Sequence, residues 1–195
     1  MKELITAIRN RKLEEVIAIT NKKPEFVHCS VKRLPKRDAG QSALQIAIKT
    51  DNLDIAEFLI NKGADVNFIE DKNIAEVPTP VLHDCITSVF HRSIFNDKAF
   101  YDEALNLLKL MLLKGANPKA VDWSGNSALH RAILDTRRMV TYPDFNEMEK
   151  VTVERFREIF EMLIDAGADI NEATDTRERA IDYVKKFELE KHELF

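Results

Sequence analysis

The sequence contains little glycine, proline, cysteine or tryptophan. Its 195 residues include 5 Gly, 6 Pro, 2 Cys and 1 Trp. So few turn-forming residues favour helices over a fold of many short strands. The two cysteines, Cys29 and Cys85, make neither a disulfide framework nor a metal-binding pattern, so we expect a reducing compartment, by default the cytoplasm.

An excess of charge of one sign is also missing. The chain has 29 Lys and Arg against 33 Asp and Glu, a net charge of −4. Nucleic-acid-binding proteins usually carry a basic excess or stripe, so we expect no nucleic-acid partner. One short basic run is made of Lys32, Arg33, Lys36 and Arg37. It predicts a solvated loop, and a site for phosphate or an acidic partner is the alternative.

Long apolar runs are absent too. The N-terminal segment becomes charged again by Arg9, so it lacks the apolar stretch of a signal peptide. The most apolar segment, 105–113, is too short to cross a bilayer and contains Lys109. We therefore expect no membrane partner. Apolar residues make up 45% of the chain and charged residues 32%, a mixture typical of a folded domain.

What the sequence does contain is an internal repeat. One phrase reads NKGADVN at 61–67, LKGANPK at 113–119 and DAGADIN at 165–171. Its glycines are Gly63, Gly115 and Gly167, spaced 52 residues apart, and each follows the i, i+3, i+4 apolar stripe of a helix. A glycine directly after such a stripe typically ends the helix in the left-handed conformation.

A second phrase precedes the first. It reads GQSALQIAI at 40–48, TPVLHDCI at 79–86 and GNSALHRAI at 125–133, with a weaker copy, ERAIDYV, at 178–184. Ser or Thr at its start is a helix cap, and Pro suits the first helical position. The two phrases together predict repeated pairs of short helices.

These phrases resemble the ankyrin repeat, whose signature is a T-P-L-H-x-A helix start within a period of about 33 residues. Residues 42–67 fit the pattern without a gap, and the resemblance covers nearly the whole chain. It implies an all-α fold with short β-hairpin turns, an ankyrin-repeat solenoid of about four repeats plus a partial C-terminal capping repeat. A generic helical bundle would explain the apolar stripes but not the repeated glycine phrase. We expect a single domain, 1–195, with repeats at approximately 1–37, 38–68, 69–119, 120–171 and 172–195.

The end repeats depart from the pattern. Arg11 and Lys23 stand where the first repeat would have glycine, and Arg177 stands where the last hairpin would have it. A non-glycine residue in left-handed geometry costs about 1 kcal/mol. We therefore expect different turns at 22–24 and 175–179.

The third and fourth repeats contain extra residues. Leu44 to Gly63 takes 19 steps, whereas the matching distances in the third and fourth repeats are 33 and 38. These insertions fall between the two helices of each pair, roughly at 88–102 and 135–153. Either they extend the helices into a small lobe whose aromatic residues pack together, or they form a second partner surface. Their large side chains are Phe90, Phe95, Phe100, Tyr101, Met139, Tyr142, Phe145 and Met148.

The resemblance implies a protein-interaction module that is a monomer when unbound. It also implies that such a module binds a folded protein partner through its hairpin tips and the concave face of its first helices. The positions that vary within the family fall here on Lys49, Thr50, Glu70, Lys72, Trp123, Ser124, Asn126, Leu134, Asp135, Asp175, Thr176 and Glu178. Trp123 lies at the tip of the hairpin between the third and fourth repeats. It is either an exposed binding hot spot or a ring laid flat over the next hairpin.

No enzyme, cofactor or metal site is expected. By resemblance, His83 and His130 are structural residues of the helix-start motif. His83-Asp84 resembles half of a metal phosphohydrolase pair, but no second ligand cluster accompanies it. His28-Cys29 lacks the third member of a catalytic triad. Two alternatives to a general interaction module stay open: an inhibitor of a specific protein, such as a bacterial immunity protein or a host-directed effector, and a hydrolase that uses His83 or His91.

Overall fold

The computed structural model describes residues 1–32, 36–141 and 145–194, which contain nine α-helices and no sheet. The helices are α1 (Lys2–Arg9), α2 (Leu13–Lys22), α3 (Ala43–Lys49), α4 (Leu53–Asn61), α5 (Val81–Ser93), α6 (Lys98–Leu113), α7 (Ala128–Met139), α8 (Phe145–Asp165) and α9 (Ala180–Lys186). Three short 3-10 turns are η1 (Pro24–His28), η2 (Lys36–Asp38) and η3 (Glu190–His192). The predicted β-hairpin turns are loops with isolated bridges, Ser30 to Ser42 and Ile69 to Pro80. The all-α prediction is confirmed.

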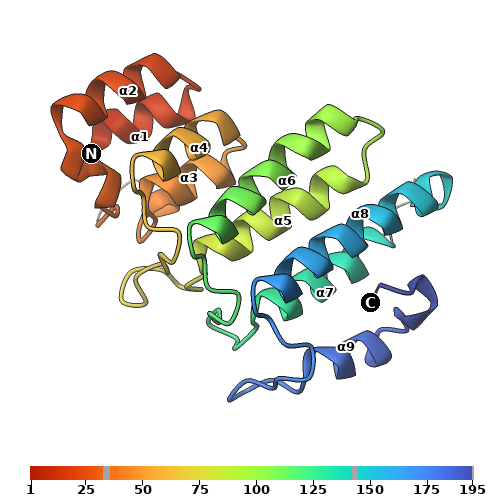
Figure 1. The fold of residues 1–195 in the computed structure, drawn as a ribbon. Helices are drawn as coiled ribbons and strands as arrows, with labels where there is room; N and C mark the ends of the chain where they lie inside the picture. Colours follow the sequence, from red (N-terminus) through yellow and green to blue (C-terminus); the bar gives the residue numbers. More distant parts are fainter. Residues whose placement is uncertain (33–35, 142–144, 195) are drawn as a thin grey trace.

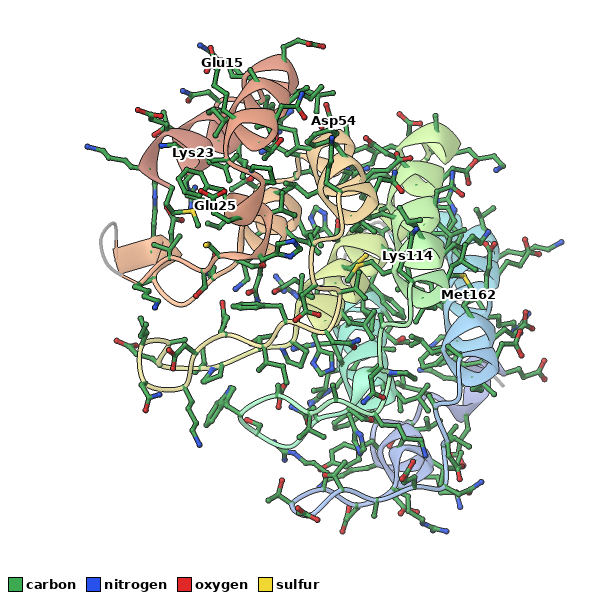
Figure 2. All side chains as sticks on the ribbon, turned by 60° about the vertical axis from the view of Figure 1, so that its left-hand side comes forward. Glu15, Lys23, Glu25, Asp54, Lys114 and Met162 are labelled. Carbon is green, nitrogen blue, oxygen red and sulfur yellow. The ribbon has the colours of Figure 1, made fainter. Side chains whose placement is uncertain are left out.

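The helices form antiparallel pairs that stack side by side (Figure 1). The first helices of the pairs, α1, α3, α5 and α7, make an inner layer that α9 continues, and each contacts the next along the stack. The second helices, α2, α4, α6 and α8, form the outer layer. Glu15 of α2 and Asp54 of α4 point outward from this layer (Figure 2). One buried apolar cluster runs through the stack from Leu4 to Leu194.

The repeated helix-start phrase caps the inner helices as its residue types predict. The Ser42 hydroxyl accepts the Gln45 backbone N–H at 3.1 Å at the start of α3. At α7, Ser127 and His130 form a reciprocal capping box. Pro80 occupies the cap position of α5 and supplies no side-chain bond. The weak fourth copy, before α9, also lacks a side-chain cap.

The glycine phrase ends the outer helices α4, α6 and α8. Gly115 has φ +87°, and its N–H donates to the Leu112 carbonyl at 2.9 Å. Lys23, at the matching place in the first repeat, has φ −138° and leads into η1, so it is not left-handed and that turn differs as expected. Arg11 does adopt the left-handed conformation, with φ 57°.

The insertion in the third repeat lengthens both helices of its pair. Helix α5 has 13 residues and α6 has 16, against 7 and 9 for α3 and α4. Phe90 is fully buried, with its ring centroid 5.1 Å from that of Phe156 and 6.0 Å from that of Phe160. Within the insertion, the Phe95 and Phe100 rings meet edge to face with centroids 5.7 Å apart, so the predicted longer helices and aromatic packing are confirmed here. In the fourth-repeat insertion, Met139 is buried, whereas the side chains of Tyr142, Phe145 and Met148 lie outside the described residues.

Two buried arginines join the lobe to the stack. Arg155 of α8 donates to the carbonyls of Ser93 and Phe95 at 2.7 and 2.8 Å, which satisfies the end of α5. Arg92 of α5 donates to Glu103 at 2.6 Å and also pairs with Asp51 of the second helix pair. A buried guanidinium needs such partners because desolvating a charge is costly. The inserted turns are consequently part of the core.

Two glycines with positive φ, one after helix α6 and one in the 122–126 turn, offer a matched pair of substitutions. Gly115 and Gly125 have similar φ values, +87° and +80°, but a Cβ at Gly115 would meet open space while one at Gly125 would overlap the Thr176 hydroxyl. Gly115→Ala should therefore destabilise by about 1 kcal/mol from backbone strain alone. Gly125→Ala should cost more, and adding Thr176→Ala should recover part of the difference in urea unfolding. Equal costs for the two glycines would contradict this geometry.

The inner-helix contact can be tested at Ala132, which is fully buried in α7. Leucine there should overpack the contact and destabilise the protein by about 1–3 kcal/mol. The matched control is Ala99→Leu, at an exposed position of α6, expected within about 0.5 kcal/mol of the parent. The urea midpoint measures both, and an unchanged midpoint for Ala132→Leu would contradict the packing.

Candidate partner-binding surface at the hairpin tips

The loops between successive helix pairs project from one side of the stack (Figure 1). The turn at 122–126 is fixed by its own side chains. The Asp122 carboxylate accepts the backbone N–H groups of Ser124 and Asn126 at 2.8 and 3.0 Å. The Asp122 carbonyl accepts the Gly125 N–H at 2.9 Å. Such side-chain-to-backbone bonds set the turn without a sheet.

Neighbouring hairpins are bonded to one another. The backbone N–H of Trp123 donates to the Pro78 carbonyl at 3.0 Å, which joins this turn to the preceding loop. On the other side, the Thr174 hydroxyl donates to the Gly125 carbonyl at 2.8 Å and the Thr176 hydroxyl to the Ser124 carbonyl at 3.2 Å. The tips of three successive loops therefore form one connected surface.

Trp123 is the most prominent apolar side chain on this surface. It is 65% exposed, so its ring is not laid flat over the next hairpin. Val121, in the same loop, is 40% exposed. Exposed aromatic rings on a fixed turn are common contact residues in protein interfaces.

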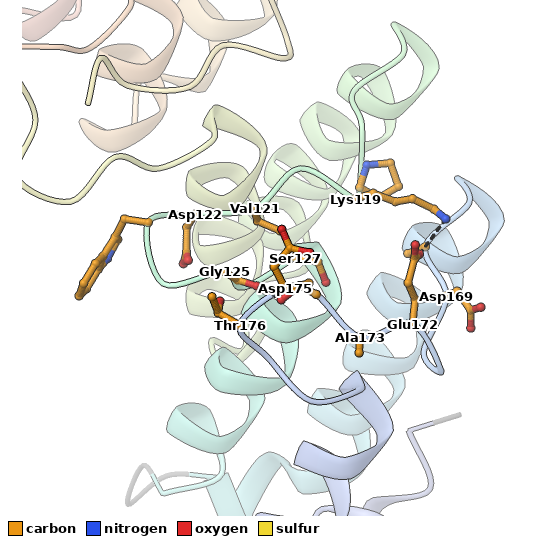
Figure 3. Close-up of a pocket in the computed structure, with 14 residues that line it drawn as sticks. Lys119, Val121, Asp122, Gly125, Ser127, Asp169, Glu172, Ala173, Asp175 and Thr176 are labelled. Atoms are coloured by element: carbon orange, nitrogen blue, oxygen red, sulfur yellow. Dashed lines mark hydrogen bonds and ion pairs between the residues drawn. The ribbon is translucent and has the colours of Figure 1, made fainter. Parts of the chain in front are cut away.

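A cleft of about 380 Å³ separates the loops 118–127 and 168–176 (Figure 3). Lys119 and Glu172 face each other across it as an ion pair at 2.7 Å. The other charged groups that line it are acidic: Asp122, Asp169 and Asp175. The cleft is therefore an acidic site next to an exposed indole.

A polar cluster lies beside the tips on the concave face. Asp84 of α5 accepts a hydrogen bond from the Gln45 amide at 2.6 Å and lies 3.8 Å from the Lys49 ammonium. Lys49 also pairs with Glu70 at 2.7 Å. Burial raises the pKa of Asp84 to about 7, against the opposing effects of Lys49 and Gln45. This carboxyl is thus partly protonated near neutral pH.

Comparison with known proteins supports the repeat assignment. Residues 39–72 match the family model "Ankyrin repeat". The chain therefore contains an ankyrin repeat. It is 31% identical over 93 residues, 48% of its length, to the B-cell lymphoma 3 protein homolog of Mus musculus. It is 29% identical over 122 residues, 60% of its length, to a putative ankyrin repeat protein of Acanthamoeba polyphaga mimivirus. These matches span only 17% and 14% of the two relatives.

The predicted contact residues differ in how much of each side chain is exposed. The exposed ones are Lys49, Lys72, Trp123, Asp175, Thr176 and Glu178. The half-buried ones are Thr50, Ser124 and Leu134. Most of the exposed predicted residues therefore lie in the loops at the hairpin tips.

Three predicted contact residues are buried, which corrects their proposed direct role. Asn126 donates to Asp122 within its own turn. Glu70 is 6% exposed and accepts from Lys49 and from a backbone N–H. Asp135 is 1% exposed and accepts the Thr87 hydroxyl at 2.8 Å, and burial raises its pKa. These side chains support the surface from beneath. Lys119 and Glu172 were not predicted as site residues, and Asp84 was considered only as half of a metal pair, since a single sequence does not show which residues line a cleft or cluster.

The two motif histidines differ in their surroundings. His130 has Nδ1 2.8 Å from the Ser127 hydroxyl and Nε2 2.8 Å from the Glu178 carbonyl, so Nε2 carries the proton. His83 is 1% exposed, and burial lowers its pKa to about 4. Proline at its cap position offers no hydroxyl. Both environments favour the structural role over contact with a substrate.

Two searches of the described ranges bear on the other function classes. Within 1–32, 36–141 and 145–194, no group of three or more His, Cys, Asp or Glu side chains could hold a metal ion. In the same part of the chain no helix combines the length and apolarity needed to cross a membrane.

The polar cluster around Asp84 predicts that the stability of the fold depends on pH. Since Asp84 titrates near 7 when folded and near 4 when unfolded, the folded state holds an extra proton between these values. Stability from this group is therefore present at low pH and is lost as pH rises through 7. Asp84→Asn mimics the neutral acid and does not titrate. The melting temperature of this variant minus that of the parent should therefore be larger in mildly alkaline buffer than in acidic buffer. A difference that does not change with pH would contradict this account.

Proposed function

We propose that this chain is a protein-interaction module whose partner binds across the hairpin tips and the adjoining concave face. Ankyrin repeats are generally protein–protein interaction modules. The observation that carries the proposal is Trp123, which is 65% exposed beside the acidic cleft on a turn bonded to both neighbouring loops.

The geometry of the tips favours a folded partner. A standard interface buries about 1,600 Å² in total, an area that about three adjacent repeats supply. Hot spots concentrate at the centre of an interface and favour Trp. Trp123 lies between the third and fourth helix pairs, which puts it at the centre of such a patch. Because the turns are fixed by hydrogen bonds, little ordering entropy is lost on binding.

The charges of the cleft suggest what enters it. Three carboxylates line the cleft besides the Lys119–Glu172 pair. A basic side chain from the partner would be attracted by these carboxylates and could stack on the indole of Trp123. A nucleic acid would be repelled by them. The unpaired Cys29 and Cys85 fit a reducing compartment, and we propose that the chain works in the cytoplasm as a monomer until it binds.

Replacing Trp123 by alanine tests the proposal. Trp123→Ala should weaken partner binding by at least about 2 kcal/mol, because hot-spot residues carry that much. The melting temperature should barely change, since the ring is mostly exposed. Lys49→Ala and Asp175→Ala, nearer the ends of the patch, should cost less.

The matched control is Leu113→Ala, which removes an 83% exposed apolar side chain at the end of outer helix α6. Parent, Trp123→Ala and Leu113→Ala proteins serve as baits in a lysate of the source organism, with quantitative mass spectrometry. A protein retained by the parent and Leu113→Ala but lost by Trp123→Ala is then purified and titrated. Equal retention by all three baits, or a large fall in melting temperature for Trp123→Ala, would contradict the proposed role.

A further inference from the structure

A second groove, of about 670 Å³, lies at the N-terminal end of the stack and is separate from the tip cleft. Helix α1, the turn η1 and the segment after η1 line it. Lys23 and Glu25 mark the entry to η1 in Figure 2. Among its apolar residues, Ile5 and Val31 are 5% and 6% exposed, whereas Met1 and Phe26 are half-buried.

The sequence builds this groove from a second face of α1. Leu4, Ala7 and Ile8 are buried in the core, whereas Met1, Ile5 and Arg9 follow at i, i+4 and i+8 and line the groove. The opposite wall is fixed by the first hairpin. Its Val31 N–H donates to the Gln41 carbonyl at 2.8 Å, and the Val31 carbonyl accepts from Gly40 at 2.7 Å.

The rim of the groove is basic. Arg9 pairs with Asp38, whose side chain is fully buried, so this acid is neutralised within the wall. Lys2, Lys32 and Arg37 also line the groove and are exposed. Within the described residues, no acidic side chain lies in ion-pair range of these three. Lys32 and Arg37 belong to the short basic run that the sequence analysis singled out.

The groove combines an apolar lining with an exposed basic rim. Its volume falls in the range of about 300–1,000 Å³ typical of ligand sites. An apolar ligand would leave the basic rim without counter-charge, and a polyanion would leave the apolar lining exposed. A ligand with both characters satisfies both surfaces.

We infer that this groove binds an acidic amphipathic peptide segment of a second protein partner. Apolar side chains of the segment pack against Met1, Ile5, Phe26 and Val31. Its carboxylates pair with Lys32 and Arg37. The attraction weakens as salt rises, because the rim charges are exposed.

Cys29 provides a reporter inside the groove. It lines the groove and is half-buried, whereas Cys85 is fully buried, and burial raises the pKa of the Cys85 thiol. A maleimide should therefore alkylate Cys29 selectively in the folded protein, since the thiolate is the reactive form. The alkylation rate reports whether the groove is occupied.

The probes are two fluorescein-labelled helical peptides with the same leucine face, one with glutamates and one with lysines on the polar face. The glutamate peptide should raise fluorescence anisotropy and slow alkylation of Cys29. The lysine peptide should bind at least about tenfold more weakly, a free-energy difference that charge complementarity supplies readily. Trp123→Ala should change neither result, so this test is independent of the tip surface.

Charge reversal tests the rim directly. Lys32→Glu with Arg37→Glu should weaken the glutamate peptide at least about tenfold. The matched control, Lys114→Glu with Lys150→Glu, changes the net charge equally at exposed positions away from the groove and should have no such effect.

Four outcomes would overturn the inference. They are equal binding of the two peptides, binding that leaves the Cys29 rate unchanged, equal loss in both charge-reversed variants, and self-association that protects Cys29 without peptide. The last, seen by sedimentation, would make the groove an interface between copies of this chain.

Discussion

Each helix pair in this chain is too small to bury its own apolar face, so the fold depends on contact between neighbouring inner helices. Ala47, Cys85 and Ala132 occupy the same place in α3, α5 and α7, and each is fully buried. Their small side chains let successive helices pack closely. One residue further on, Ile48, Ile86 and Ile133 are also buried, which makes the core continuous along the stack.

This contact also fixes the spacing of the loops, and with it the proposed binding surface. Asn67 shows the link: its amide donates to the Gly115 carbonyl at 2.9 Å and its oxygen accepts the Asn117 N–H at 2.7 Å. The bonds of Trp123 to Pro78 and of Thr174 to Gly125 continue the series. A partner at the tips would therefore meet a prearranged row of turns. A change in the packing of the inner helices would alter the positions of these turns.

Much of the fold could be predicted from the sequence because its signals are local. Glycine after an apolar stripe fixed the ends of the outer helices, as the positive φ of Gly115 confirms, and Ser42 and Ser127 marked the starts of inner helices. Where a signal was weak, at Lys23, the turn differed. The site was less predictable, since exposure depends on partners distant in sequence. Asp135 is buried because Thr87, 48 residues earlier, donates to it. The repeat boundaries and the contact role of the exposed residues stay predictions.

The proposed partner contacts the hairpin tips and the inner layer, so its footprint on the chain tests the proposal most directly. Hydrogen exchange of the free and partner-bound chain, resolved by peptide, measures that footprint. Added protection should appear in the loops 117–127 and 168–179 and at the end of α3, and outer helices α4 and α6 should exchange as in the free chain. Protection confined to the outer helices, with the loops unchanged, would contradict the account.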